Sequence, residues 1–218
     1  MKDNLDPSIF GQTPWQTVGP FFHYSLPWLG GADLTGQSDL GGRPDLFPPE
    51  HNVLNRCIFS GPVNGEIIDI AGQVRDGDGQ PVPDAMVEIW QANAGGRYVG
   101  RTDIRSDVGL DRNFTGFGRA ATSDDGRYRF RTIRPGPVPG PGNMMQAPHI
   151  AMGIFGRGLL KRLITRLYFS DAPENAADPI LALVPADRHK TLIAKKSGAI
   201  WQFDIILQGQ DETVFFSF

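Results

Sequence analysis

Histidine and tyrosine are the side chains of this sequence best suited to metal chemistry, and each type occurs four times in the 218 residues. Imidazole nitrogen and phenolate oxygen together suit an oxygen-loving metal ion. By number alone, the set is large enough to surround one ion. The eight residues are His23, His51, His149, His189, Tyr24, Tyr98, Tyr128 and Tyr168.

The segment APHIAMGIFGRG, residues 147–158, has half of a metal-binding pattern. It predicts a β-strand, in which residues two apart point to the same face. A metal-binding strand would carry a second histidine two positions after His149, but Ala151 stands there. By itself, His149 indicates a buried, hydrogen-bonded histidine more strongly than a metal ligand.

The spacing of the other candidates favours structural roles. Tyr128 occupies an inward position of an alternating strand, and Tyr168 lies in LITRLYF, which has the composition of a core strand. His189, in PADRHKT, predicts a solvated helical residue. His51 follows FPPE in a loop and has no candidate partner nearby in the sequence.

The elements that must position these residues are short β-strands separated by turns, since glycine (27) and proline (18) together make up about a fifth of the chain. The clearest strand is GRYRFRTI, in which arginines alternate with an inward set, Tyr128, Phe130 and Thr132. A short helix is expected after Asp178, because aspartate is a good cap and Pro179 fits the first helical position. The other expected strands are IIDIAGQVRD, MVEIWQA, HIAMGIF, LITRLYF and WQFDIILQG.

This pattern predicts an all-β fold, an antiparallel β-sandwich with a long N-terminal arm and one or two short helices. Residues 66–218 are expected to form the sandwich. Residues 1–65 show little periodicity, and TPWQTVGPFFHY within them combines aromatic side chains with prolines and small residues. That composition predicts an arm of loops that docks on a partner chain.

Composition excludes several classes of function. The net charge is −3 with no long run of one sign, which disfavours nucleic acid as a partner. Cys57 is the only cysteine, so the chain forms no internal disulfide and no thiolate metal cluster. The first residues lack the apolar stretch of a signal peptide, and no apolar run is long enough to cross a bilayer. We therefore expect a cytoplasmic protein without a membrane partner.

Three segments together carry a resemblance to a known family: VEIWQANAGGRY (87–98), FTGFGRAATSDDGRYRFRTIRPGPVP (114–139) and APHIAMGIFGRGLLKRLITRLYFSD (147–171). In this order and spacing they resemble the intradiol ring-cleaving dioxygenases, and the likeness runs from about Thr13 to Phe218. The resemblance implies the β-sandwich of an enzyme family that holds a non-haem Fe(III) with two tyrosines and two histidines.

Carried over residue by residue, the ligand positions of the family fall on Ser106, Val138, His149 and Ala151, and only His149 matches. RTDIRSDVGLDRNF contains no tyrosine, PGPVP has Val138 where the family has its second tyrosine, and HIAM has Ala151 in place of the second histidine. The resemblance therefore implies a chain that holds no metal ion and supplies no catalytic residue of its own.

Some members of this family are built from two homologous chains, of which only one carries iron, and TPWQTVGPFF and GQDETVFFSF resemble the iron-free type. Such a pair cleaves protocatechuate with O₂ to 3-carboxy-cis,cis-muconate in the β-ketoadipate pathway. The resemblance implies that a homologous partner chain holds the Fe(III). It also implies that Thr17, Gly19, Pro20 and Arg157 form one wall of the substrate pocket, where small residues admit a flat ring and a guanidinium attracts a carboxylate.

Two other interpretations stay open. The chain could be a self-sufficient dioxygenase with an unusual ligand set, such as His149 with distant tyrosines or histidines. It could instead be a non-enzymatic β-sandwich that acts as a scaffold or binds an aromatic compound. The lack of replacement donors at three positions counts against the first, and the arm and the full-length resemblance count against the second.

Overall fold

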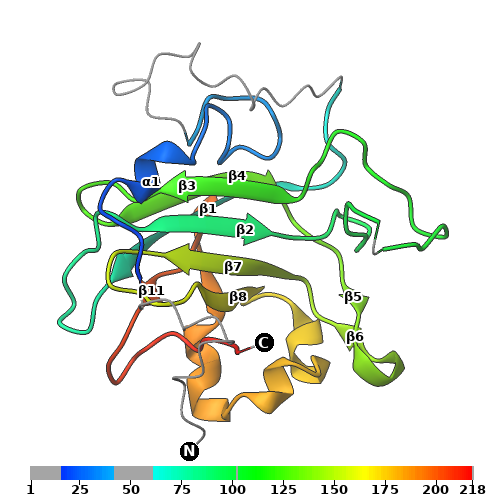
Figure 1. Cartoon of the computed structure of the whole chain (residues 1–218). Coiled ribbons are helices and arrows are strands. Elements are labelled where there is room, and N and C mark those ends of the chain that lie inside the picture. Colours follow the sequence, from blue (N-terminus) through cyan, green and yellow to red (C-terminus); the bar gives the residue numbers. More distant parts are fainter. Residues whose placement is uncertain (1–15, 42–60, 102, 218) are drawn as a thin grey trace, which may run out of the picture.

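The computed structural model describes residues 16–41, 61–101 and 103–217, which form a sheet of short strands with small helical turns at one end (Figure 1). The strands are β1 (Ile67–Arg75), β2 (Met86–Trp90), β3 (Phe117–Ala121), β4 (Arg127–Ile133), β5 (Val138–Pro139), β6 (Met145–Gln146), β7 (His149–Phe155), β8 (Leu163–Phe169), β9 (Ile193–Ser197), β10 (Ile200–Gln202) and β11 (Ile205–Ile206). The helical elements are α1 (Phe22–Ser25) and the 3₁₀ turns η2 (Pro141–Asn143), η3 (Pro173–Ala177), η4 (Leu181–Leu183) and η5 (Ala186–Thr191).

The main sheet runs β1, β10, β9, β8, β7, β2, β3, and β4 and β11 also pair with β1. The outer strands β3 and β4 contact each other, so the sheet curls into a nearly closed sandwich (Figure 1). The predicted all-β sandwich is confirmed, with one difference. β1 runs parallel to β10 and β11, and β8 runs parallel to β9. For β8 and β9, the 3₁₀ turns between them supply the crossover connection that parallel pairing requires.

The core lies between the two layers and is built from alternating side chains. In β4, Tyr128, Phe130 and Thr132 are buried as the sequence predicted. The rings of Phe169 and Trp201 meet edge to face, 5.0 Å apart between centroids. Each large apolar side chain buried in this way contributes about 1.5–3 kcal/mol to the free energy of unfolding.

Strand β2 is buried on both faces, which a simple inside–outside alternation does not anticipate. Glu88 is buried on the face that α1 and the following loop cover, and its two carboxylate oxygens pair with Arg119 (2.6 Å) and Arg162 (3.2 Å). Gly153, the cross-strand partner of Glu88, leaves the space for this contact. A Cβ atom at position 153 would lie 2.2 Å from Nε of Arg162.

The described part of the predicted N-terminal arm packs on the chain itself. Ala32 and Leu34 are buried in the main core, and Asp33 forms a parallel bridge with Arg131 of β4. Docking of the arm on a partner chain stays a prediction. His51 and Cys57 lie outside the described residues. No helix among the described residues is long and apolar enough to cross a membrane.

The helix predicted after Asp178 is a single 3₁₀ turn, η4. The predicted position of the cap was wrong, because the N-cap of η4 is Ile180, but Oδ1 of Asp178 does accept hydrogen bonds from the backbone N–H groups of Ile180 (2.9 Å) and Leu181 (2.7 Å). The turn does not lengthen into an α-helix because Val184 precedes Pro185 and is extended, with ψ 136°. A residue before proline is disfavoured in the helical region by steric clash.

Candidate functional site

His149, which the resemblance predicts to be the one retained ligand position, is a buried residue at the start of β7. Its Nδ1 lies 2.8 Å from the carbonyl oxygen of Ala147. Because a carbonyl only accepts hydrogen bonds, Nδ1 carries the proton and Nε2 keeps the lone pair. Burial, followed by the charge of Arg166, lowers the pKa of His149 from 6.5 to about 4, so the ring is neutral at pH 7.

The three other positions that the resemblance assigns to ligands hold no histidine or tyrosine that could join His149. Ser106 is exposed in the loop after β2, and Val138 is buried in β5, where it pairs with Gln146 of β6. Ala151 lies on β7 between its cross-strand partners on β2 and β8. In the described part of the chain, no group of three or more histidine, cysteine, aspartate or glutamate side chains could hold a metal ion.

A positive charge occupies the neighbourhood of the lost ligands. Arg166 of β8 is the cross-strand partner of Ala151. Its Nη1 donates hydrogen bonds to Oε1 of Gln146 (2.6 Å) and to the hydroxyl of Tyr168 (3.4 Å). Its charge also acts on the pKa values of His149 and Tyr98. Two like unit charges about 4 Å apart repel by about 4 kcal/mol at an effective dielectric constant of about 20. One neutral imidazole beside a guanidinium does not fit a ferric ion.

Tyr168 is the core aromatic residue that the sequence predicted. It is fully buried opposite His149, and its hydroxyl donates to Oδ1 of Asp178 at 3.2 Å. Burial is the main cause that raises the pKa of Tyr168 to about 12, so the phenol stays protonated at neutral pH. Asp178 is itself buried and also accepts from the backbone N–H of Ala147 at 2.7 Å. These contacts fix the start of β7 to η4.

The remaining candidates lie apart from His149 or have structural partners. Tyr98 stacks on Trp90 with ring centroids 6.0 Å apart, and burial raises its pKa. Tyr128 is buried in β4 and donates its hydroxyl hydrogen to the carbonyl of Phe203. His189 is partly exposed in η5, as predicted, and its Nε2 lies 2.8 Å from the carbonyl of Val184. The alternative of an unusual iron ligand set gains no support from these positions.

The second predicted group, the pocket wall, is drawn from parts of the chain that are distant in sequence. The structure brings Thr17 to the turn after β7, where its Oγ1 accepts a hydrogen bond from Gly158 N–H at 2.9 Å. Gly19 and Pro20 follow and are exposed, and the carbonyl of Gly19 accepts from Phe22 N–H at the start of α1. Phe22 then packs on Phe155 with centroids 5.7 Å apart.

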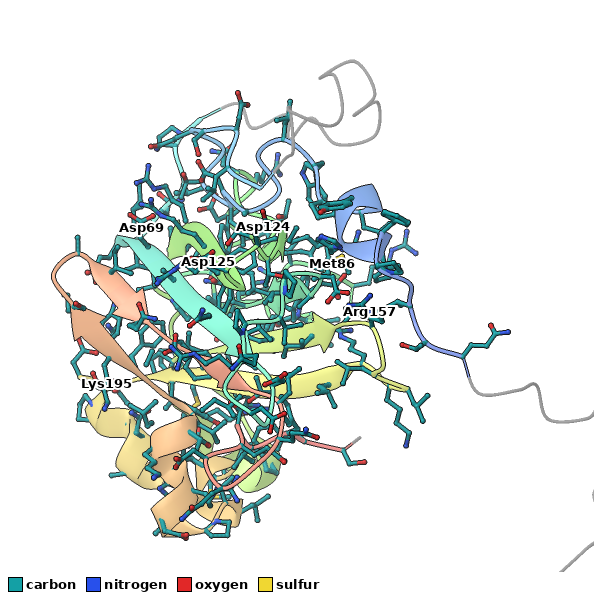
Figure 2. The ribbon with its side chains drawn as sticks, turned by 90° about the vertical axis from the view of Figure 1, so that its left-hand side faces the viewer. Asp69, Met86, Asp124, Asp125, Arg157 and Lys195 are labelled. Carbon is teal, nitrogen blue, oxygen red and sulfur yellow. The ribbon has the colours of Figure 1, made fainter. Side chains whose placement is uncertain are left out.

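Arg157 lies in the same turn, and its side chain is 61% exposed. Figure 2 shows Arg157 at the end of the strand beside the N-terminal segment. Gly158 adopts φ +86°, a conformation that favours glycine and lets the chain turn sharply there. Nε of Arg157 lies 3.1 Å from Oδ2 of Asp84, a residue that sequence reasoning did not single out. The arrangement can present a cation to an anionic group outside this chain.

A surface hollow of about 480 Å³ lies between β1, β4 and β3 and contains none of the predicted site residues. Its lining mixes small side chains such as Ala120 and Ala121 with Arg127, Arg129 and the edge of Tyr128. Neither His149 nor Arg157 borders it. The chemistry indicated by the sequence therefore belongs to the two groups described above.

The sequence and the fold of this chain are similar to those of known dioxygenases. A family model described as Dioxygenase matches residues 49–209. The protocatechuate 3,4-dioxygenase alpha chain of Burkholderia cepacia is 41% identical over 94% of this chain and 96% of its own length. The beta chain from the same organism is 40% identical over 79% of this chain and 77% of its own.

Among solved structures, the dioxygenase domain of a dioxygenase–carbohydrate-binding protein fusion from Streptomyces sp. SirexAA-E is similar to this chain. The TM-score is 0.51 at 25% identity, over 70% of this chain and 86% of that one. The resemblance read from the motifs is confirmed by these matches. The chain belongs to the intradiol dioxygenase family.

Proposed function

We propose that this chain is the iron-free, alpha-type subunit of a protocatechuate 3,4-dioxygenase. The observation that carries the proposal is the 41% identity to an alpha chain across almost the whole of both proteins. In the proposed complex, both atoms of O₂ enter protocatechuate and the bond between the two hydroxyl-bearing carbons breaks. The product, 3-carboxy-cis,cis-muconate, then enters the β-ketoadipate pathway.

The Fe(III) of this complex is assigned to a homologous beta-type partner chain. Two observations support the assignment. Ser106, Val138 and Ala151 stand where the family has ligands, and Arg166 places a guanidinium beside the remaining His149. A beta chain at 40% identity indicates that the two chain types share one fold, which lets equivalent surfaces of the two chains meet.

The contribution proposed for this chain is one wall of the substrate pocket in the assembled complex. The exposed backbone at Gly19 and Pro20 has no bulky side chain, so a flat aromatic ring can approach it closely. Arg157, in the adjoining turn, attracts the carboxylate of protocatechuate. Thr17 links the two segments through its hydrogen bond with Gly158. The wall supplies shape, exclusion of water and placement of the carboxylate.

The partner proposed for this surface is the iron-bearing chain itself. Phe21 follows Pro20 and is 75% exposed, next to the proposed wall. Leaving such a side chain in water forgoes about 1.5–3 kcal/mol that burial at an interface would contribute. We assign residues 1–65 to the arm that docks on the partner and residues 66–218 to the sandwich. The complex is expected to act in the cytoplasm on protocatechuate and O₂.

Co-expression of this chain with a beta-type chain that has both tyrosines and the paired histidines tests the proposal. The two chains should purify together, contain iron, consume one O₂ per protocatechuate and form 3-carboxy-cis,cis-muconate. This chain alone should do none of these. A complex that fails to form, or a lone chain that turns over protocatechuate with its own iron, would contradict the proposal. Binding of aromatic compounds without turnover in any combination would favour the scaffold alternative.

A further inference from the structure

We propose that Asp84 is a positioning residue that aims the guanidinium of Arg157 toward the substrate carboxylate, an inference that rests on the function proposed for Arg157. Asp84 lies just before β2 and is only 9% exposed. Its Oδ2 is completely buried and accepts no hydrogen bond from the described residues. The one ion-pair partner that the described part of the chain gives it is Arg157, at 3.1 Å.

The register of β2 and β7 explains why these two residues meet. Met86 is the cross-strand partner of Phe155, the last residue of β7. Asp84 and Arg157 lie in the turns two residues beyond these paired ends. Figure 2 shows Met86 and Arg157 on the same side of the structure. The pairing of β2 with β7 therefore brings the two turns together, and the ion pair joins them at 3.1 Å.

The neighbouring carboxylate cannot take the role of Asp84. Both oxygens of Glu88 are held by Arg119 and Arg162, on the covered face of β2. Apart from this ion pair through its Nε, Arg157 makes no hydrogen bond with any described residue, so the N–H groups of its two terminal nitrogens remain available. A guanidinium has five such donors in a fixed plane, and a carboxylate can accept two of them side by side.

Two anchors therefore hold Arg157 while leaving the N–H groups of its two terminal nitrogens free. The backbone of its turn is tied to Thr17 by the Gly158 hydrogen bond, and its side chain is drawn inward by the buried charge of Asp84. A side chain held in its binding orientation loses less freedom when the ligand arrives, which strengthens binding. Without Asp84, the exposed guanidinium would sample many orientations in water.

The test uses the complex with the iron-bearing chain and compares Asp84→Asn, Arg157→Ala and the double variant. Asparagine keeps the shape of aspartate and removes its charge. Asp84→Asn should raise KM for protocatechuate about three- to tenfold with little change in kcat, and should change catechol turnover less than about twofold, since catechol has no carboxylate. In the Arg157→Ala background, Asp84→Asn should have no further effect. Asp211→Asn, which breaks the exposed pair with Lys190, is the matched control.

The possible outcomes separate the two proposals. If Arg157→Ala weakens protocatechuate turnover and Asp84→Asn does not, the positioning role of Asp84 is wrong and the role of Arg157 stands. If Asp84→Asn lowers the turnover of both substrates equally, Asp84 acts on the fold and the inference is overturned. The same holds if Asp84→Asn lowers protocatechuate turnover as much in the Arg157→Ala background as in the wild type. If Arg157→Ala leaves the preference for protocatechuate over catechol unchanged, the proposed role of Arg157 fails, and the inference fails with it.

Discussion

Arg166 on β8 is the cross-strand partner of Ala151 on β7, so a guanidinium lies next to the position where the intradiol family carries its second histidine. A hydrogen bond of 2.6 Å to Gln146 holds this cation in place. Besides lacking donors, this site therefore holds a charge of the same sign as a metal ion.

The first prediction is that restoring one ligand does not restore iron binding. Ala151→His would recreate the HIH pattern, but the new imidazole would face Arg166, and no tyrosine stands at positions 106 and 138. Like-charge repulsion of several kcal/mol and the missing anionic donors both oppose Fe(III). Purified wild-type chain and the Ala151→His variant should each contain well under about 0.1 iron per chain in elemental analysis.

A beta-type chain purified in parallel is the positive control, since it has the full ligand set. Stoichiometric iron with a visible tyrosinate absorption band in the isolated wild-type chain would show that ligands outside the pattern hold the metal. The same result for Ala151→His alone would show that Arg166 does not exclude the ion.

The second prediction concerns the dependence of stability on pH. The pKa of His149 is 6.5 in the unfolded reference and about 4 in the folded chain, so folding excludes a proton from this ring. The contribution of His149 to the free energy of unfolding is therefore fully present above about pH 6.5, and it is lost progressively as the pH falls toward about 4. A shift of this size corresponds to about 3 kcal/mol. Urea denaturation at several pH values between 4.5 and 7.5 measures it.

His149→Gln should flatten this part of the profile, because glutamine does not titrate. His189→Gln is the matched control, since it makes the same substitution at a partly exposed histidine. An unchanged slope in His149→Gln would mean that other groups cause the acid sensitivity.

The alternation within single strands could be predicted from sequence because it is a local property. The inward set Tyr128, Phe130 and Thr132 follows from a period of two, and the hydrogen bonds that Asp178 accepts from the turn after it follow from the residue types around Pro179. The retained family motifs also assigned the degenerate ligand positions, including Val138 and Ala151, and this assignment stays a prediction.

Contacts between distant segments could not be predicted in this way. Asp84 meets Arg157 only because β2 and β7 pair in one particular register, and Thr17 reaches Gly158 across 141 positions of sequence. In the sequence, Arg166 likewise looks like an ordinary polar residue of a strand, and only the pairing of β7 with β8 shows that it lies beside Ala151. The position of this charge beside Ala151 is therefore visible only in the fold.

The third prediction is that Asp178 is among the most important polar residues for stability. Its carboxylate accepts hydrogen bonds from the backbone N–H groups of Ala147, Ile180 and Leu181, and from the hydroxyl of Tyr168. Asp178→Ala leaves these donors without an acceptor and should lower the free energy of unfolding by about 3–4 kcal/mol. Asp171→Ala, which removes an exposed partner of Arg134, should cost less than about 1 kcal/mol. Equal losses in chemical denaturation would contradict this reading of Asp178.

The fourth prediction places Phe21 at the interface with the partner chain. Because this side chain is 75% exposed, Phe21→Ser should leave the melting temperature of the isolated chain within about 1 °C. It should weaken association with the beta-type chain about tenfold or more, since a buried aromatic ring is worth about 1.5–3 kcal/mol. Sedimentation or mass photometry over a dilution series measures the association. Unchanged association would place the interface elsewhere.

The fifth prediction is that removing the exposed Arg157 destabilises the isolated chain, contrary to the usual effect of trimming a surface arginine. Arg157→Ala leaves Oδ2 of Asp84 buried without its ionic partner. The exposure of Arg157 screens part of the pair, so we expect a loss of about 1–2 kcal/mol in the free energy of unfolding. Lys190→Ala, which removes one member of the exposed pair with Asp211, should cost less than about 0.5 kcal/mol.

The double variant decides whether the loss comes from the buried carboxylate. Adding Asp84→Asn to Arg157→Ala removes the unpaired charge and should recover at least half of the stability, because a neutral amide is far less costly to bury than an isolated carboxylate. The two residues act independently if the loss of stability in the double variant equals the sum of the losses in Arg157→Ala and Asp84→Asn. The 3.1 Å ion pair would then contribute nothing to the free energy of unfolding. Water or another chain would have to stabilise the buried carboxylate of Asp84.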